Sequence, residues 1–340
     1  MISPETALDE IFKLLAPLGT EEVPLRAAGG RFLARAVRAP HDQPPFPASA
    51  MDGYAVTGCV PDLGTSYEVI GESAAGHRFT GHLSAGQAVR IFTGGVVPEG
   101  TTRILLQEDI TRDGQTAKVT GPVGTGTHIR PAGGDFTAGA EVSAPRRLNA
   151  HDLTLLASMN QPRVTVYRRP VVAIMATGDE LVLPGSPCGP GQIHASNSFG
   201  LGALVEAAGG IARLMPIARD TEGSLKAVFS LTEGADLIVT IGGASVGDHD
   251  LVGPVARDLG MEQSFYKVAM RPGKPLMAGR LGATPMVGLP GNPVSSIVCG
   301  HIFLRPALAV LQGLEAAPLP RQPAPLAHDI DTNGPREHNM

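Results

Sequence analysis

The sequence predicts a multidomain protein that combines a three-layer α/β/α domain with a helical linker region and a small β domain. The 340 residues exceed what one ordinary core holds. The second half alternates apolar strands with helices, and short β-branched runs separated by Gly, Thr and Pro precede it. We expect a helical/linker domain at 1–45 and 139–168, a β domain at 46–138, an α/β domain at 169–313, and the start of a truncated C-terminal β domain at 314–340.

The N-terminal region is predicted to be mainly helical. Ser3 and Pro4 are typical of a helix start, and a second helical stretch is expected over residues 31–37. The first helix places four apolar side chains on one face: Leu8, Ile11, Phe12 and Leu15. Because such a face needs a partner, we expect a twofold contact between two chains to bury it.

The β domain is expected to contain a small, mostly antiparallel sheet. Its strands are predicted at five short runs: Tyr54–Val56, Tyr67–Ile70, Ala88–Phe92, Arg103–Leu106 and Ala117–Val119. Asp52 stands in an apolar, glycine-kinked setting before the first run, and Thr93 directly follows the third. Each of these two residues is, by itself, most often an ordinary strand end. A helix is expected at residues 150–159.

From residue 169 onward, apolar strands alternate with helical patterns. Strands are expected at 171–176, 211–217, 236–241 and 285–289, and helices at 198–208, 225–231, 251–259 and 293–311. Parallel βαβ units in a three-layer sandwich are the natural solution for this pattern. In such a sheet, ligands bind beyond the carboxyl ends of the strands.

Composition excludes several classes of function. A net charge of −5 without basic tracts argues against nucleic acid as a partner, and the absence of Trp leaves no base-stacking platform. Cys59, Cys188 and Cys299 are far apart and form no CxxC pair, which suits a reducing cytoplasm. The N-terminus is not a signal peptide, and no apolar run is expected to reach membrane-spanning length. We therefore expect a cytoplasmic protein with no membrane contact.

The run from residue 240 to 250 is the most informative stretch of the chain. It leaves an apolar strand, precedes a helix, and contains three glycines and two carboxylates: Gly242, Gly243, Gly247, Asp248 and Asp250. Glycines let backbone N–H groups approach an anion closely. Carboxylates beside a phosphate make sense if a divalent metal bridges them. Magnesium fits this pattern better than zinc, because the sequence has no HExxH motif and no clustered His.

A second glycine-rich loop opens the next helix, with Asn292 as its N-cap and Pro293 at the first helical position. A basic segment lies between the two loops and contains three cations: Lys267, Arg271 and Lys274. Lys274 taken alone is usually a solvated turn lysine, but lysine is scarce in this chain. Together the loops and the basic segment predict a site for a phosphorylated, metal-bridged small molecule.

Other residues after the predicted strands leave alternatives open. Asp179 or Glu180 would project into the crevice at the carboxyl edge of the sheet, although a polar turn is about as common. Asp220 follows the next strand, or it simply caps the helix that begins near Thr221.

A hydrolase is the sharpest rival interpretation. Ser245 stands in a G-x-S-x-G pattern between a strand and a helix, as in a nucleophile elbow. Asp258 and His301 are the best available partners for a triad. Because His301 falls inside the predicted helix 293–311 rather than on a loop, this interpretation is not favoured.

These segments together closely resemble the molybdopterin molybdenumtransferase family, MoeA and the gephyrin E domain. The matching pieces, in the family's order, are SAMDGYA (49–55), TGG (93–95), Arg130 with Gly133 and Asp135, TGDEL (177–181), Ser196-Asn197, GGASVGDHD (242–250), KVAMRPGKP (267–275) and GLPGNPVSS (288–296). The resemblance spans residues 1–313 and implies that the α/β domain is a MogA-like molybdopterin-binding domain. It implies insertion of molybdate into adenylylated molybdopterin with Mg²⁺ and release of AMP. It further implies an elongated homodimer whose cleft is shared between the β domain of one subunit and the α/β domain of the other.

The resemblance also implies roles for individual residues. Catalytic roles fall on Asp52, Thr93, Asp135, Glu180, Asp220, Asp250, Lys267 and Lys274. Binding of the pterin falls on Gly242, Gly243, Ser245, Gly247, Arg271, Pro290, Asn292 and Pro293, and binding of the metal on Glu180, Asp248 and Asp250. The chemistry agrees, because a molybdate dianion beside a pyrophosphate needs cations and N–H groups to offset like-charge repulsion. The protein's task is to position the two anions beside each other, and no protein nucleophile is required.

The sequence departs from the family's usual pattern at Pro47, Ala48, Gly134, Ala195 and Arg271. These departures favour, as an alternative, a catalytically weak molybdopterin-binding or scaffolding paralogue. A third functional class is a molybdopterin adenylyltransferase, which shares the α/β domain. The resemblance also suggests such an adenylyltransferase as a binding partner. Residues 333–338 resemble the start of the family's C-terminal β domain, which leaves a fragment or a short paralogue as alternatives. Sequence also leaves open whether tungstate replaces molybdate.

Overall fold

The computed structural model describes residues 1–242, 251–323, 325 and 337–338. The chain packs as two compact units. The first comprises Met1–Arg35, Ala144–Ala150 and Arg163–Met340, and we call it the α/β unit. The second comprises Ala36–Ser143 and His151–Pro162, and we call it the β unit. The predicted domain boundaries remain a prediction.

A six-stranded sheet forms the centre of the α/β unit. Its strands, in spatial order, are β18 (Ile211–Leu214), β15 (Val171–Ala176), β19 (Leu237–Ile241), β23 (Thr284–Leu289), β22 (Met277–Leu281) and β20 (Met261–Tyr266). The first four are parallel to one another, and β22 and β20 are antiparallel to their neighbours. The sequence predicted the parallel strands and missed the antiparallel pair. Because Met277 lies opposite Gly288, the turn between β20 and β22 lies at the carboxyl edge of β23.

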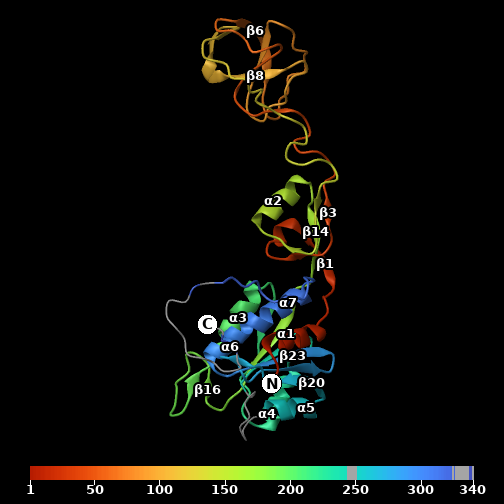
Figure 1. The fold of residues 1–340 in the computed structure, drawn as a ribbon, viewed down its shortest axis with the longest axis vertical. Helices are drawn as coiled ribbons and strands as arrows, with labels where there is room; N and C mark the ends of the chain where they lie inside the picture. Colours follow the sequence, from red (N-terminus) through yellow and green to blue (C-terminus); the bar gives the residue numbers. More distant parts are fainter. Residues whose placement is uncertain (243–250, 324, 326–336, 339–340) are drawn as a thin grey trace. The chain divides into compact units, whose positions relative to one another are not determined.

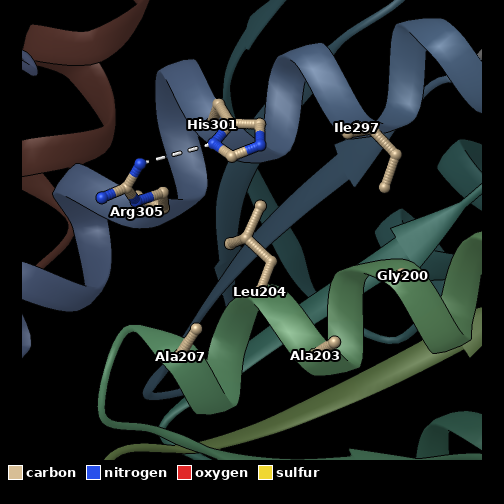
Figure 2. Close-up of a pocket in the computed structure, with 7 residues that line it drawn as sticks. All are labelled: Gly200, Ala203, Leu204, Ala207, Ile297, His301 and Arg305. Atoms are coloured by element: carbon tan, nitrogen blue, oxygen red, sulfur yellow. Dashed lines mark hydrogen bonds between the residues drawn. The ribbon is translucent and has the colours of Figure 1, made fainter.

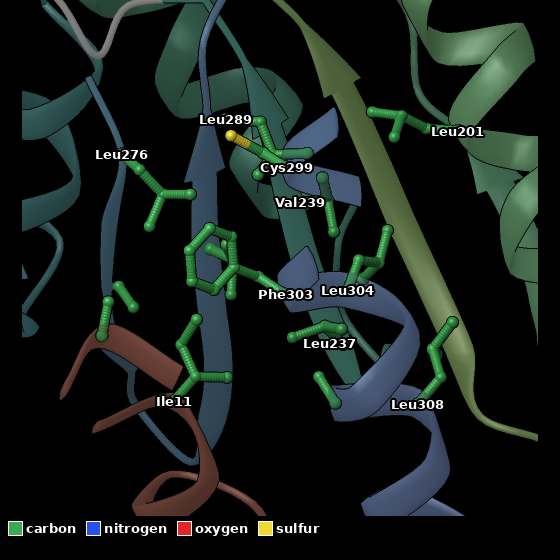
Figure 3. Packing of buried hydrophobic residues seen from close by; sticks show 14 of the residues in the cluster. Ile11, Leu201, Leu237, Val239, Leu276, Leu289, Cys299, Phe303, Leu304 and Leu308 are labelled. Carbon is green, nitrogen blue, oxygen red and sulfur yellow. The ribbon is translucent and has the colours of Figure 1, made fainter. Parts of the chain in front are cut away.

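Helices cover both faces of this sheet, as the three-layer prediction required (Figure 1). One face carries α1 (Pro4–Lys13), α3 (Asn197–Ala207) and a helical run composed of α6 (Pro293–Cys299), a π-helical turn (Gly300–Leu304) and α7 (Arg305–Leu311). The other face carries α4 (Glu222–Ser230) and α5 (Val252–Asp258). Alternate residues of β19 feed the two cores, with Leu237 and Val239 in the first and Ile238 in the second. Figure 3 shows Phe303 and Leu304 beside the side chains of the sheet.

Helix α1 begins where the sequence predicted. The Ser3 hydroxyl accepts a hydrogen bond from Thr6 N at 3.1 Å, which caps the helix start. Its apolar face, however, is buried within its own chain, because Leu8 and Ile11 belong to the core of the α/β unit. The prediction that this face needs a second chain is therefore wrong.

The helical run from α6 to α7 widens at a proline. Pro306 has no backbone N–H to continue the α-helical ladder, and its ring would clash with the carbonyl of Ile302 one turn earlier. The turn that precedes it is π-helical, which accommodates the ring without ending the helix. This run, Pro293–Leu311, is long and apolar enough to cross a membrane, contrary to the prediction that no stretch reaches that length, but 61% of its apolar window is buried inside the protein. It is weak evidence for a membrane span.

A small sheet in the α/β unit corrects one predicted helix. Its order is β1 (Thr20–Pro24), β14 (Arg163–Tyr167), β2 (Phe32–Leu33) and β13 (Arg146–Arg147). Residues 31–37 were predicted to be helical, yet Phe32 and Leu33 are both buried and pair with β13 and β14. Pairing with distant strands overrides the helix propensity of so short a segment.

The β unit is built on a second six-stranded sheet. Its order is β8 (Arg103–Leu106), β5 (Gly53–Val56), β7 (Gln87–Ile91), β6 (Ser66–Ser73), β10 (Thr116–Val119) and β9 (Ile110–Asp113). All pairs are antiparallel except β6 with β7, so the mostly antiparallel prediction is confirmed. Val56 and Leu105 pack in one hydrophobic cluster, and Ala55 and Ile104 in another, so both faces of the sheet are covered.

Shorter elements complete the described chain. Strand pairs are β3 (Val37–Arg38) with β12 (Glu141–Val142), β4 (Ala48–Ser49) with β11 (Ile129–Arg130), β16 (Leu181–Val182) with β17 (Ile193–His194), and β21 (Met270–Arg271) with β24 (Glu337–His338). Helix α2 (Ala150–Ser158) and the 3₁₀ turns Leu25–Ala27 and Gln107–Asp109 are the remaining helical elements. Helix α2 was predicted to within one residue.

Candidate functional site

Three loops meet at the carboxyl edge of the α/β sheet. Thr177 N donates to Ile241 O at 3.0 Å, and Gly242 N donates to Leu289 O at 3.0 Å. The parallel hydrogen-bond ladder therefore continues beyond the strand ends into the loops that start at Thr177, Gly242 and Pro290. This is the edge where open α/β sheets bind ligands.

Glycines let two of these loops touch. A Cβ on Gly291 would lie 3.4 Å from Gly242 Cα, and Gly242 itself has a φ of +88°. Asn197, the first residue of α3, donates from Nδ2 to Gly291 O at 2.8 Å. The buried Pro290 precedes this contact. Asn197 belongs to a segment that resembles the family, but the sequence analysis assigned it no role. Its hydrogen-bond acceptor is a backbone carbonyl 94 positions away, which sequence patterns do not reveal.

The start of α6 is as predicted. Asn292 Oδ1 accepts a hydrogen bond from Ser295 N at 3.0 Å, and Pro293 occupies the first turn. Both Asn292 and Pro293 are exposed to solvent at the carboxyl edge.

The acidic loops after β15 and β18 are tied to each other. Asp179 Oδ1 accepts from Asp220 N at 3.1 Å, and Asp220 Oδ2 accepts from Asp179 N at 3.3 Å. Thr221, not Asp220, caps α4, because its hydroxyl accepts from Ser224 N. Asp220 therefore braces the loop that carries Glu180.

Glu180 itself is exposed above a glycine. Its carboxyl carbon lies 2.7 Å from the position that a Cβ on Gly178 would occupy, so Gly178 leaves room for the carboxylate. Arg219 holds this loop from the side by donating to Asp179 O at 3.0 Å and to Leu181 O at 3.1 Å. Arg219 escaped sequence-based prediction because both partners are backbone carbonyls, which leave no side-chain pattern.

The turn between β20 and β22 brings three predicted cations to the same edge. Arg271 and Lys274 are exposed, and none of the described carboxylates lies within ion-pair distance of either. Lys267 is half-buried with its ammonium 4.9 Å from the centre of the Tyr266 ring. Arg271 and Lys274 thus have positive charge that no described acid neutralises, which an anionic ligand can use.

The backbone of this turn is firmly held. Lys274 O accepts from Val268 N at 3.0 Å and from Leu276 N at 3.1 Å, and Ile2 forms a bridge with Val268. Gly273, at a φ of +115°, packs against α6, where a Cβ would lie 2.7 Å from Cys299 Sγ. Burial raises the pKa of the Cys299 thiol to about 12, so this cysteine is an inert packing group.

The β unit presents a second set of predicted residues at the ends of β5 and β7. Asp52 Oδ1 accepts from Thr93 N at 2.8 Å and from Thr93 Oγ1 at 2.7 Å. The Thr93 backbone N–H and hydroxyl, followed by the charge of Arg90, hold the pKa of the Asp52 carboxyl below its usual value. Asp52 is therefore an ionised, oriented carboxylate rather than an ordinary strand end.

Asp135 occupies a neighbouring part of the β unit. It forms an ion pair with Arg130, on β11. Strand β4 connects the two places, because Ser49 pairs with Ile129 and its carbonyl accepts from Gly94 N at 2.9 Å. The matching segments SAMDGYA, TGG and Arg130–Asp135 thus converge within one unit.

The structure brings the predicted residues together in two groups. The β unit holds Asp52, Thr93 and Asp135, and the α/β unit holds Glu180, Asp220, Gly242, Lys267, Arg271, Lys274, Pro290, Asn292 and Pro293. Five predicted residues lie outside the described part of the chain: Gly243, Ser245, Gly247, Asp248 and Asp250.

The geometry argues against the hydrolase interpretation. Asp258 lies on α5, which packs on one face of the sheet, whereas His301 lies in the helical run on the opposite face. A triad needs direct hydrogen bonds between its members. These two side chains cannot serve one catalytic serine.

An apolar groove of about 440 Å³ lies between α3 and the helical run α6–α7 (Figure 2). It is lined by Gly200, Ala203, Leu204, Ala207, Ile297, His301 and Arg305. None of the residues that the family resemblance assigns to the site is among them.

Comparison with known proteins agrees with both halves of this description. Residues 2–160 match the family described as MoeA N-terminal region (domain I and II), and residues 173–310 match the probable molybdopterin binding domain. A molybdopterin molybdenumtransferase from Nostoc is 37% identical over 336 residues, which cover 96% of this chain and 77% of that protein. The chain belongs to the molybdopterin molybdenumtransferase family.

Further members of the molybdenumtransferase family support this assignment. The Haemophilus influenzae enzyme of the same name is 36% identical over 87% of this chain and 74% of its own length. The crystal structure of a molybdopterin biosynthesis MoeA protein from Pyrococcus horikoshii superposes with a TM-score of 0.76 at 31% identity, covering 92% of this chain and 80% of that one. The match to the MoeA N-terminal region also sets this chain apart from the adenylyltransferase alternative, for which the sequence offered the α/β domain alone.

Proposed function

We propose that this molybdenumtransferase-family chain inserts molybdate into adenylylated molybdopterin and releases AMP in molybdenum cofactor biosynthesis. The observation that carries the proposal is the convergence of the glycine loops at Gly242 and Gly291 with the uncompensated cations Arg271 and Lys274 at one sheet edge. Such an edge suits a substrate that carries a pyrophosphate.

The proposed chemistry assigns distinct tasks to the residues of the α/β unit. Lys267, Arg271 and Lys274 offset the repulsion between the molybdate dianion and the phosphates of the pterin. The half-buried Lys267 is desolvated relative to the two exposed cations, so its charge acts more strongly on a bound anion. The rigid loops contribute by fixing both anions beside each other, which removes part of the entropic barrier to their reaction.

Magnesium is part of this proposal. The described residues contain no group of three or more His, Cys, Asp or Glu side chains that could hold a metal. Among them, the exposed carboxylate of Glu180 is the best donor, because Asp179 and Asp220 are engaged with each other. The other proposed ligands, Asp248 and Asp250, lie outside the described residues. Magnesium bound there would supply positive charge to the phosphate oxygens.

Asp52, Thr93 and Asp135 are proposed to act in the same reaction from the β unit. Asp52 is ionised and its orientation is fixed by Thr93. A fixed carboxylate can accept a proton or position a metal-bound water, but it repels a bare oxyanion. We therefore propose that Asp52 acts as a proton acceptor or through a metal-bound water, and not as a direct contact of the bare oxyanion.

The test is an assay of AMP release. Purified protein is supplied with adenylylated molybdopterin and Mg²⁺, with and without molybdate. We expect molybdate-dependent AMP release, which Lys274→Ala lowers and which Lys226→Ala, at a half-buried position of α4 that pairs with Glu222, leaves unchanged. Absence of release by the wild-type chain would favour the catalytically weak paralogue. Synthesis of the adenylylated pterin from ATP would favour the adenylyltransferase. A parallel assay with tungstate decides the choice of oxyanion.

We also propose that the chain acts as a homodimer in the cytoplasm, with the adenylyltransferase as a transient partner. The groove between α3 and α6 supports a second copy as its occupant. Phe199 and Val294, on these two helices, are 49% and 63% exposed. Glu206 on α3 and Arg305 on α7 offer opposite charges that a twofold contact can pair.

Light scattering tests the dimer. Ala203→Arg, in the floor of the groove, should shift the protein to a monomer, whereas Ala227→Arg, on the exposed side of α4, should not. A wild-type monomer, or a dimer that tolerates Ala203→Arg, would contradict this interface.

A further inference from the structure

We infer that Arg90 is a positioning residue that fixes the Asp52–Thr93 pair by bridging the strand ends that carry it; this inference rests on the proposed role of that pair. Arg90 lies on β7, two residues after Ala88, where the pairing of β7 with β5 begins. The ladder places Tyr54 opposite Arg90 and Gly53 opposite Ile91. Asp52 directly precedes Gly53, and Thr93 follows Ile91 by two residues, so both lie just beyond the paired ends of two adjacent strands.

The guanidinium of Arg90 ties three strand ends together. Its Nη1 donates to Gly53 O at 3.0 Å, directly after Asp52. Its Nη2 donates to Gln107 Oε1 at 2.7 Å, directly after β8. Gln107 in turn donates from its backbone N to Asp52 O at 3.1 Å. The backbone of Asp52 is thus held on both sides by a closed set of hydrogen bonds that passes through Arg90.

Aromatic rings hold the guanidinium in place. Its central carbon lies 4.5 Å from the centre of the Phe92 ring and 5.1 Å from that of Tyr54. Phe92 is the residue directly before Thr93, so the contact also restrains the other member of the pair. A lysine could supply the charge but not the planar fork that reaches two acceptors while stacked on rings.

Gly53 makes this close assembly possible. A Cβ at residue 53 would overlap the carbonyl group of Leu105 on the neighbouring strand β8. Strands β5 and β8 therefore approach each other closely here, and Arg90 bonds Gly53 at the start of β5 and Gln107 directly after β8. No described acid forms an ion pair with Arg90, so its charge is free to act on Asp52.

The experiment compares Arg90→Gln and Arg90→Lys with the control Arg112→Gln. Arg112, on β9 of the same sheet, is exposed and bonds only Gly114 O among the described residues. Hydrogen exchange of the Thr93 amide, followed by NMR, reports whether Asp52 still holds it. We expect exchange to accelerate by about tenfold or more in both Arg90 variants, as for loss of a hydrogen bond to a charged group, and not in the control.

The Asp52 titration separates charge from position. The groups that act on its carboxylate are Thr93, by two hydrogen bonds, and Arg90, by charge. Arg90→Gln removes that charge and should raise the pKa of Asp52 toward its ordinary value, whereas Arg90→Lys should raise it less. Gln107→Ala, which keeps Arg90 itself, should give a smaller acceleration of Thr93 exchange and serves if the Arg90 variants do not fold.

Activity then completes the test. In a chain that releases AMP with molybdate, Arg90→Lys should lower kcat with little change in KM for the pterin, because the pair is displaced while the binding loops are intact. If the wild-type chain releases no AMP, the proposed function fails while the exchange result still decides this inference. Wild-type Thr93 exchange and an unshifted Asp52 titration in Arg90→Gln would overturn it.

Discussion

The two units hold their predicted site residues by different means. In the α/β unit, the residues stand on backbone loops at the edge of a sheet that is buried on both faces, and two of its cations are free of acids within the described chain. In the β unit, Asp52 and Asp135 are each already paired, with Thr93 and with Arg130. In the α/β unit, positive charge is therefore available for a ligand. In the β unit, the charges of the two carboxylates are already engaged in contacts that orient them.

The two units are therefore sensitive to different substitutions. Loops fixed by backbone bonds and core packing lose their geometry when the layer beneath them is disturbed. A carboxylate fixed by side chains loses its geometry when one of those side chains changes. The sheet edge should therefore respond to core substitutions, and the β unit to single polar ones.

The largest expected effect is on the core under the α/β sheet. Phe303→Ala should lower the free energy of unfolding by about 3–5 kcal/mol, because a fully buried aromatic side chain leaves a cavity. Phe199→Ala, which removes a side chain that is 49% exposed, should change it much less, and within about 0.5 kcal/mol if the groove is uncovered. Denaturant unfolding followed by circular dichroism measures both. Equal losses would contradict the assigned core.

A smaller and more local effect is expected at the basic turn. Gly273→Ala forces a Cβ to within 2.7 Å of Cys299 Sγ and 2.8 Å of Met270 Cε, so the turn that carries Arg271 and Lys274 must shift. We expect weaker binding of inorganic pyrophosphate, measured by calorimetry. Gly282→Ala is the matched control, because Gly282 also has a positive φ but faces open space. If both variants bind equally well, the packing of the turn on α6 does not position its cations.

The smallest effect concerns the reactivity of the three cysteines and is measured on the unsubstituted protein. Cys59 and Cys188 are exposed, whereas burial raises the pKa of Cys299 to about 12. Because the thiolate is the reactive form, iodoacetamide at neutral pH should label the first two in the native protein. All three should react after unfolding. Rapid native labelling of Cys299, read by mass spectrometry, would show that the layer beneath the basic turn opens.

Much of the α/β architecture was predictable from the sequence. The strand at Val171–Ala176 was located to the residue, because a continuous apolar run is the pattern of a strand buried on both faces. Strands β20 and β22 were missed because MEQSFY and MAGRL have no such run, and the pairing of β22 with β23 decides their conformation. The helix predicted over residues 31–37 failed for the same reason.

The site was predictable at the level of motifs rather than contacts. The Asn292-Pro293 pair identified the start of α6 correctly, whereas the predicted glycine loop after β19 lies outside the described residues beyond Gly242. Arg219 and Arg90 were not found, because Arg219 acts on backbone carbonyls of a distant loop and Arg90 acts on a carbonyl and a ring of the neighbouring strand β5. The spacing of residues along the chain holds no record of such contacts.

We propose that the Asp52–Thr93 pair of one chain and the cationic sheet edge of a second chain act in one reaction in the proposed dimer. An Asp52→Asn chain and a Lys274→Ala chain should each be nearly inactive alone in molybdate-dependent AMP release. When the two are mixed under conditions that exchange subunits, a heterodimer regains one site with both residues intact. We expect recovered AMP release in the mixture, up to about half of the wild-type rate per heterodimer from one of its two sites. Mixed chains that exchange subunits yet stay inactive would contradict it.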